Sequence, residues 1–394
     1  MPSIAYLECT RCSARISPKS PQGLCPQCGG FLFVRYEMAA LRLSAPRENI
    51  LKRIDAANTS LGMWRYADVL PAVEPVTLGE GVTPMLRSRR YPGLFLKQEA
   101  ANPTGTCEAR GFSMAVSLAR HYGLKKLAMA SPGKAAGALA AYAAAAQIAA
   151  HVFMPPDVPQ VHYLEAAAYG AQVTLVDGLI SDCARTIAER KDAEGWFDVS
   201  SLKEPFRVEG TKTMGYELVE QSGWRYPDAV ICPNGAGVGL IGIWKAFEEM
   251  EVLGWVSGRR PKIIAVESSS SAHPDELIDE LILDIVRQSG GLSLDFEDGQ
   301  IRMSLLDWAR QEGLLLSPAG AAATAAYDHL ITSGWLSPEE KVVIFDTGTG
   351  LNHADVIATA LQLASSSAAT AAEKDHRGVT LPSRYRVGGI ITPQ

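Results

Sequence analysis

The chain has 394 residues, of which 47% are hydrophobic and 20% are charged, so it is long enough to bury one large core or two ordinary ones. Its 37 Lys and Arg residues are outnumbered by 43 Asp and Glu residues, and the formal charge of −6 leaves no basic stripe for a nucleic-acid backbone. The most apolar stretch, residues 135–154, contains Gln147 and His151, which favours a core helix followed by a strand over a membrane span. We therefore expect no nucleic-acid partner and no membrane partner.

Two Cys-x2-Cys pairs open the chain, Cys9 with Cys12 and Cys25 with Cys28. Such pairs can turn four thiolates onto one ion, and tetrahedral coordination stabilises a segment that is too small for a core of its own. We therefore predict a structural zinc ribbon over residues 1–40, with redox-active or unmetallated pairs as the alternative. Four protein ligands leave no open position for water, so we expect no catalysis at this ion.

The start of the chain and its cysteine content favour the cytoplasm. The first six residues carry neither the basic region nor the apolar run of a secretory signal. Seven cysteines are too few for a disulfide scaffold in a chain of this size, and paired cysteines in a reducing compartment more often bind metal.

From about residue 79 onward, short apolar runs alternate with helical patterns such as 161–169, 183–191 and 239–250. The strand-like runs are 94–97, 127–130, 151–154, 173–176, 229–232, 263–266 and 342–345. This alternation predicts an α/β fold with open, mostly parallel sheets and helices on both faces. Ligands of such sheets bind beyond the carboxyl ends of the strands, where the loops before the helices lie.

Three of these loops could carry chemistry. In the first, Lys134 falls in the opening turn of a helix, where the dipole disfavours a cation. Lys134 should therefore have an anionic partner, unless it simply faces solvent. The second loop, 346–351, places hydroxyls and glycines after a strand, which suits a polar ligand or an ordinary capped turn.

The third loop has a glycine at every second position, which lets backbone N–H groups converge on an anion at a helix start. Its residues are Asn234, Gly235, Ala236, Gly237, Val238 and Gly239. The loop lacks the Lys-Ser/Thr of a P-loop and the spacing of a dinucleotide fingerprint. A phosphate site and a tight packing turn both explain it.

Read together with the runs LGEGVTP (78–84), LKQE (96–99), NPTG (102–105) and FRVEGTKT (206–213), the three loops resemble threonine synthase. That family belongs to the tryptophan-synthase-β superfamily, fold type II of the pyridoxal phosphate (PLP) enzymes. The resemblance implies a large domain of residues 41–110 and 206–365, a small domain of 111–205, a tail of 366–394 and a homodimer. It also covers the cysteine ribbon, which some members share.

The resemblance breaks where the family carries its Schiff-base lysine. After NPTG this chain reads TCEARG, which puts Glu108 at the position of that lysine. A carboxylate cannot form an imine, and the lysine normally also moves protons on the substrate. We therefore expect that PLP binds non-covalently or not at all.

Other ligand-facing positions are changed or retained. In the loop that grips the substrate carboxylate in the family, Ser131 and Gly133 match, while Lys134 replaces the Asn that contacts a ring oxygen of the cofactor. Arg207 matches an arginine that binds the substrate's phosphate, and Thr347 matches the residue at the pyridine nitrogen. The retained glycines and Arg207 favour an anionic, phosphorylated ligand.

Three hypotheses remain open from the residues. In the first, Glu108 and Lys134 form an ion pair across the emptied site in a repurposed lyase- or transferase-type enzyme for an anionic small molecule, because either charge alone would be costly to bury. In the second, Lys134 has taken over the role of the lysine toward PLP, with Glu108 as base. In the third, the chain is a pseudoenzyme that regulates or scaffolds.

Overall fold

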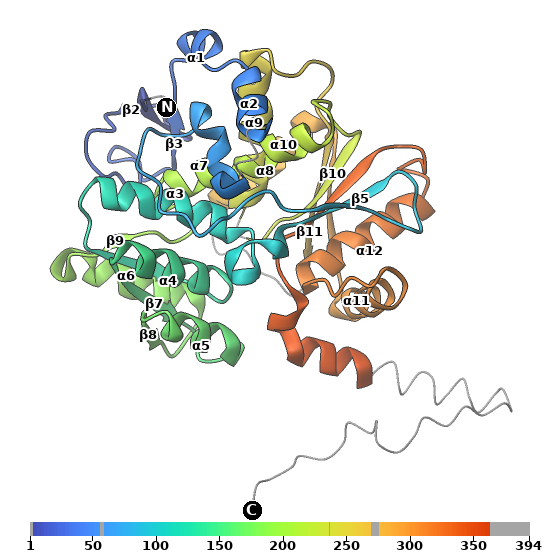
Figure 1. Cartoon of the computed structure of the whole chain (residues 1–394). Coiled ribbons are helices and arrows are strands. Elements are labelled where there is room, and N and C mark those ends of the chain that lie inside the picture. The colour runs from blue at the N-terminus through green and yellow to red at the C-terminus, as the bar shows by residue number, and fades with distance from the viewer. Residues whose placement is uncertain (1–2, 56–58, 236, 269–275, 363–394) are drawn as a thin grey trace, which may run out of the picture.

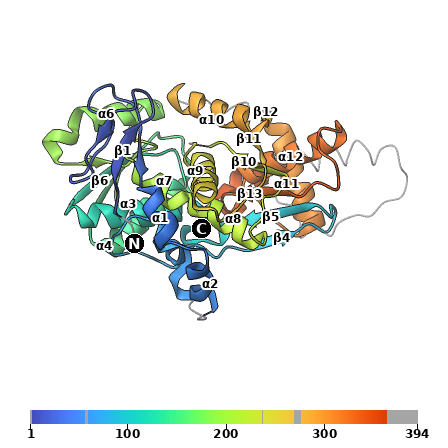
Figure 2. The same cartoon turned by 90° about the horizontal axis from the view of Figure 1, so that it is seen from above.

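The protein, seen in a computed structural model, is described for residues 3–55, 59–235, 237–268 and 276–362. These residues form three β-sheets, which have three, six and four strands. Figures 1 and 2 show the small three-stranded sheet near the N-terminus, set against a body made of the two larger sheets and their helices.

The six-stranded sheet has the strand order β12-β11-β10-β13-β5-β4, and every neighbouring pair is parallel except β4 with β5. All five residues of β10 and all five of β13 are buried, which is typical of central parallel strands covered on both faces. The strands are β4 (Met85–Arg87), β5 (Leu94–Gln98), β10 (Ala229–Pro233), β11 (Lys262–Ser268), β12 (Leu292–Phe296) and β13 (Val342–Asp346).

Side chains of this sheet alternate between two cores, as the pleat requires. Ala229 and Ile231 pack in one core with α11 and α12, whereas Val230 and Cys232 pack in the other with α8 and α9. The helices on these faces are α8 (Thr213–Gln221), α9 (Val238–Leu253), α10 (Glu276–Ser289), α11 (Asp298–Glu312) and α12 (Pro318–Thr332).

The four-stranded sheet is parallel throughout and has the order β8-β7-β6-β9. Its strands are β6 (Lys126–Ala130), β7 (Ala149–Met154), β8 (Gln172–Leu175) and β9 (Phe197–Asp198). Helices α3 (Glu108–His121), α4 (Ala135–Ala146) and α5 (Gln160–Ala168) share one core with this sheet, and α6 (Ile180–Glu194) covers the other face. Helix α7 (Phe206–Thr211) packs against α3 and α9.

The N-terminal sheet is antiparallel, with β1 (Tyr6–Cys9) between β2 (Arg15–Ile16) and β3 (Leu32–Arg35). Tyr36, just after β3, donates a hydrogen bond of 2.5 Å to the buried Glu209 on α7, which joins the ribbon to the body. The remaining elements are α1 (Met38–Ser44), α2 (Glu48–Asp55), η1 (Thr59–Val69), η2 (Glu99–Ala101), η3 (Pro103–Gly105) and η4 (Gly350–His353).

The predicted α/β architecture is confirmed: both large sheets are mostly parallel, and helices cover their two faces. The strand predicted at 173–176 begins and ends one residue earlier, at Gln172–Leu175. The domain boundaries stay a prediction, and the tail of 366–394 lies outside the described residues. No helix in the described part of the chain is both long and apolar enough to cross a bilayer.

Candidate active site

A cavity of about 570 Å³ is lined by loops that follow strands of both large sheets. This is the position where parallel sheets bind ligands, and the volume suits a small molecule. Four of the predicted site residues line it: Glu108, Ser131, Lys134 and Gly235. Arg207, Thr347, Asn234, Gly237, Val238 and Gly239 are not among the lining residues, and Ala236 lies outside the described residues.

Glu108 begins α3 and pairs with Arg207 on α7, with 2.6 Å between Oε2 and Nη2. The guanidinium also lies 4.4 Å from the centre of the Phe112 ring and donates to the carbonyl of Val199. The predicted ion pair between Glu108 and Lys134 is therefore wrong. Helices α3 and α7 pack directly against each other, so the buried Arg207, and not Lys134, lies beside the Glu108 carboxylate.

Lys134 is the N-cap of α4, and its side chain reaches across to the end of β13. The Nζ atom donates hydrogen bonds of 3.0 Å to Oγ1 and 3.2 Å to the carbonyl oxygen of Thr347. Next to Thr347, burial raises the pKa of Asp346 to about 7, while the Lys134 ammonium opposes this rise. Lys134 therefore does not face solvent; it lies within the electrostatic reach of a buried carboxyl group.

Ser131 lies in the same loop as Lys134 and is buried. Its hydroxyl donates to the carbonyl of Gly133 and accepts from the Gly133 N–H, both at 3.2 Å. The serine therefore shapes the loop that carries Lys134.

The glycine-rich turn before α9 has two residues with positive φ, Gly235 at 47° and Gly237 at 76°. A Cβ on Gly237 would lie 2.5 Å from Cγ2 of Ile278, so this glycine is needed for packing against α10. A Cβ on Gly235 would meet nothing within 4 Å, which leaves the backbone open on the cavity side. Asn234 donates to Glu267, which also lines the cavity. In this turn, Gly237 is therefore required for packing, whereas the backbone at Gly235 stays open.

Two histidines that sequence reasoning missed also line the cavity, His162 on α5 and His353 in η4. Their ring centroids are 5.9 Å apart. Burial, the neighbouring His162 and the Lys134 ammonium lower the pKa of His353 to about 4. No sequence signal could have found this pair, because the two residues come from distant segments without a ligand spacing.

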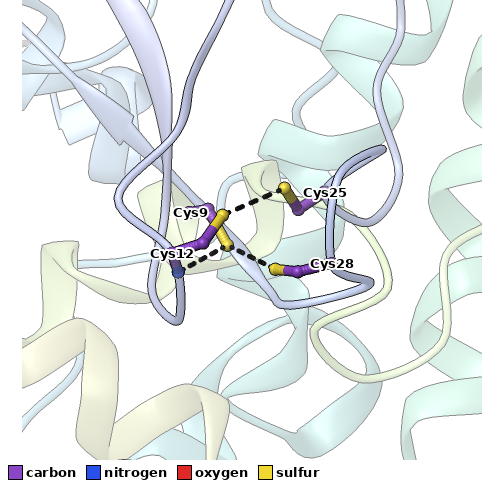
Figure 3. Close-up of side chains that lie close together, drawn as sticks. All are labelled: Cys9, Cys12, Cys25 and Cys28. Carbon is purple, nitrogen blue, oxygen red and sulfur yellow. Dashed lines mark hydrogen bonds between the residues drawn. The ribbon is translucent and has the colours of Figure 1, made fainter.

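The four ribbon cysteines come together as predicted (Figure 3), with all their Sγ atoms within 4.8 Å of one another. The Sγ atoms of Cys9 and Cys28 are 3.4 Å apart, and those of Cys12 and Cys25 are 3.7 Å apart. Tetrahedral thiolates at Zn–S distances of about 2.3 Å would lie about 3.8 Å apart. The donor set therefore fits a zinc ion.

Comparisons with known proteins show the family to which this chain belongs. Residues 76–348, more than half of the chain, match the family described as pyridoxal-phosphate dependent enzyme. Threonine synthase of Methanosarcina acetivorans is 29% identical over 377 residues, which cover 87% of this chain and 91% of the relative. Threonine synthase of Mycobacterium tuberculosis is 30% identical over 320 residues, covering 74% of this chain and 88% of the relative.

Solved structures share the fold. An O-ureido-L-serine synthase superposes with a TM-score of 0.58 at 18% identity, covering 69% of this chain and 90% of the other. A pyridoxal 5'-phosphate-dependent aspartate racemase gives a TM-score of 0.56 at 20% identity, covering 68% of this chain and 90% of the other.

These matches correct one expectation, that PLP is absent or doubtful, because the matching family and the threonine synthase relatives indicate PLP as the cofactor. The residues present fit such a group. Among the described residues that line the cavity, Lys134 is the only lysine, and a primary amine is what an aldehyde captures. The open backbone at Gly235, next to the start of α9, suits a phosphate.

Proposed function

This chain belongs to the family of pyridoxal-phosphate dependent enzymes, and from that membership we propose a PLP enzyme in which Lys134, and not residue 108, supplies the amine. The reaction we propose is of lyase or transferase type, on an anionic or phosphorylated small molecule. The observation that carries the proposal is the position of Lys134, whose amine reaches from the wall of the cavity to the hydroxyl of Thr347.

Bound PLP would supply an aldehyde that captures amines and a ring that delocalises electrons from the adjoining carbon. The turn around Gly235 and the start of α9 would hold its phosphate, and Thr347 would position the Lys134 amine, which donates to its hydroxyl. Glu108 has a different task here, because its carboxylate lies at the cavity wall and neutralises Arg207, which is buried behind it. A carboxylate cannot condense with an aldehyde, so Glu108 cannot replace the amine.

Asp346 and Lys134 would control the protons at this end of the cavity. The raised pKa of Asp346, about 7, lets this carboxyl group hold or release a proton near neutral pH. Lys134 favours the ionised form of Asp346, so a change in the charge of the amine also changes the proton affinity of the carboxyl group.

The test is reduction of the protein with borohydride after addition of PLP, followed by peptide mass spectrometry. We expect a visible absorption band and a mass increment on the peptide that carries Lys134. Lys134→Met should abolish both, whereas Lys125→Met, an exposed lysine before β6, should change neither. An increment on another lysine only, or none, would contradict the proposal.

One observation favours a second candidate, a chain that holds the cofactor without turnover. Arg207, the candidate phosphate ligand, is 1% exposed and already paired with Glu108, so a substrate anion would have to compete for it. Turnover assays decide between the two candidates. Release of phosphate from any of a panel of phosphorylated amino acids supports the enzyme, whereas labelling of Lys134 without turnover supports the inactive chain.

We also propose that the four ribbon thiolates bind one structural zinc ion. Backbone N–H groups of Arg11 and Cys12 lie 3.4 and 3.5 Å from Sγ of Cys9, where they would stabilise a bound thiolate. Elemental analysis should find one zinc per chain, and Cys12→Ser should lower this content, while replacement of the buried Cys183 should not. A full complement of zinc in Cys12→Ser would contradict the assignment.

A further inference from the structure

We propose that His162 and His353, in the protein without bound PLP, form together with the free Lys134 ammonium a subsite of the cavity that binds an anionic group and takes up a proton when it does so. The inference rests on the proposed anionic substrate. It adds where the anion binds and how pH controls that binding.

The two histidines come from different parts of the fold and meet at the cavity. His162 is carried by α5 beside the four-stranded sheet, and His353 by η4, which follows β13 of the six-stranded sheet. Their planes are inclined by 67°, with one ring edge facing the other ring. The His162 ring lies 3.5 Å from the place where a Cβ on Gly133 would stand, so the imidazole lies close to the loop that carries Lys134.

His162 has an unsatisfied polar atom. The residue is only 2% exposed, yet its Nδ1 has no hydrogen-bond partner among the described residues. A buried nitrogen without a partner is unfavourable, and the His162 residue that carries it lines the cavity. An oxyanion suits this position because it accepts hydrogen bonds from an ammonium and from an imidazole N–H at once.

The charged neighbours explain why both rings are neutral without a ligand. Burial and Lys134 lower the pKa of His162, and burial, His162 and Lys134 lower that of His353 to about 4. The carboxylate of Asp355, just beyond η4, raises both pKa values, but the effects that lower them are larger. Glu165, on the same helix as His162, packs its carboxylate against Gly137.

An anion bound beside Lys134 would offset the effect of the ammonium and favour the protonated imidazole. Binding should therefore consume a proton, and affinity should fall as pH rises. For one fully linked proton the fall is up to about tenfold per pH unit.

The experiment uses the full chain without added PLP and takes sulfate as the probe, because the charge of sulfate does not change near neutral pH. Calorimetric titration at the same pH in two buffers of different ionisation enthalpy measures the protons taken up. We expect uptake in the original protein, its loss in His162→Gln and His353→Gln, and its retention in His121→Gln, a control at the exposed end of α3.

Binding without proton uptake, uptake that persists in both variants, or no binding in the millimolar range would each overturn the inference. Asp346 also titrates near neutral pH within reach of Lys134, so loss of the uptake in Asp346→Asn would overturn the inference as well. If the glutamine variants do not fold, His162→Asn and His353→Asn take their place in the same measurement. Labelling of Lys134 by PLP and borohydride is a separate test. Failure of that labelling with intact sulfate-linked uptake would remove the proposed cofactor amine and leave the histidine subsite standing.

Discussion

Replacing Arg207 should destabilise the protein far more than replacing Lys134. The reason is that Arg207, and not Lys134, is the ion-pair partner of Glu108. The side chains of Glu108 and Arg207 are 13% and 1% exposed, so Arg207→Met leaves a mostly buried carboxylate without its cation. Breaking a buried pair costs about 3–5 kcal/mol, and the partial exposure of Glu108 puts the expected loss near the lower limit, about 3 kcal/mol.

Two other contacts of Arg207 add to this loss. Arg207 also stacks on Phe112 and donates to the Val199 carbonyl, which contribute about 1 kcal/mol each. A double-mutant cycle with Glu108→Gln cancels these two terms and should leave a coupling free energy of about 3 kcal/mol for the Glu108–Arg207 pair.

The assay is equilibrium unfolding in urea, with Lys134→Met in place of Arg207→Met as the matched control. Lys134 hydrogen bonds to Thr347, so its coupling to Glu108 should stay below about 1 kcal/mol. A coupling of Glu108 to Lys134 that equals or exceeds its coupling to Arg207 would refute the ion-pair assignment and restore the pair expected from the sequence.

Three further predictions concern buried polar groups. The folded protein raises the pKa of Asp346 from 3.8 to about 7, so the unfolded chain ionises first, and the free energy of unfolding should fall as pH rises between these values. Asp346→Asn should flatten this part of the pH profile, and an unchanged profile would contradict the assignment. Arg110→Met leaves two fully buried glutamates without their guanidinium and should lower the free energy of unfolding by about 3–5 kcal/mol; a loss below about 1 kcal/mol in urea unfolding would refute this. Tyr36→Phe removes the hydrogen bond from the ribbon to Glu209 and should cost about 1–2 kcal/mol and speed proteolytic cleavage within the ribbon, whereas unchanged cleavage would count against this docking contact.

Much of the fold was predictable because it depends on local patterns. Central strands such as β10 and β13 are short apolar runs, and their complete burial in a parallel sheet requires such runs. The cysteine pairs likewise lie close along the chain, so their spacing alone predicted that they would meet. Candidate residues at the ends of strands, such as Lys134, could be placed near a cavity by the same rule.

The partners within the site were not predictable in this way. Glu108 pairs with Arg207 because α3 packs on α7, and Lys134 reaches Thr347 because β6 and β13 direct their following loops into one cavity. The glutamate at position 108 led to the expectation that PLP is doubtful or absent, and this expectation was wrong. Membership in a family rests on the whole chain and not on a single residue.

The sequence by itself determined the architecture, the cysteine cluster and the loops that could hold a ligand. Only the tertiary structure decided which charges meet, and it alone brought His162 and His353 together. The physical reason is that periodicity and spacing act over a few residues, whereas an ion pair or a ring contact depends on how distant helices pack.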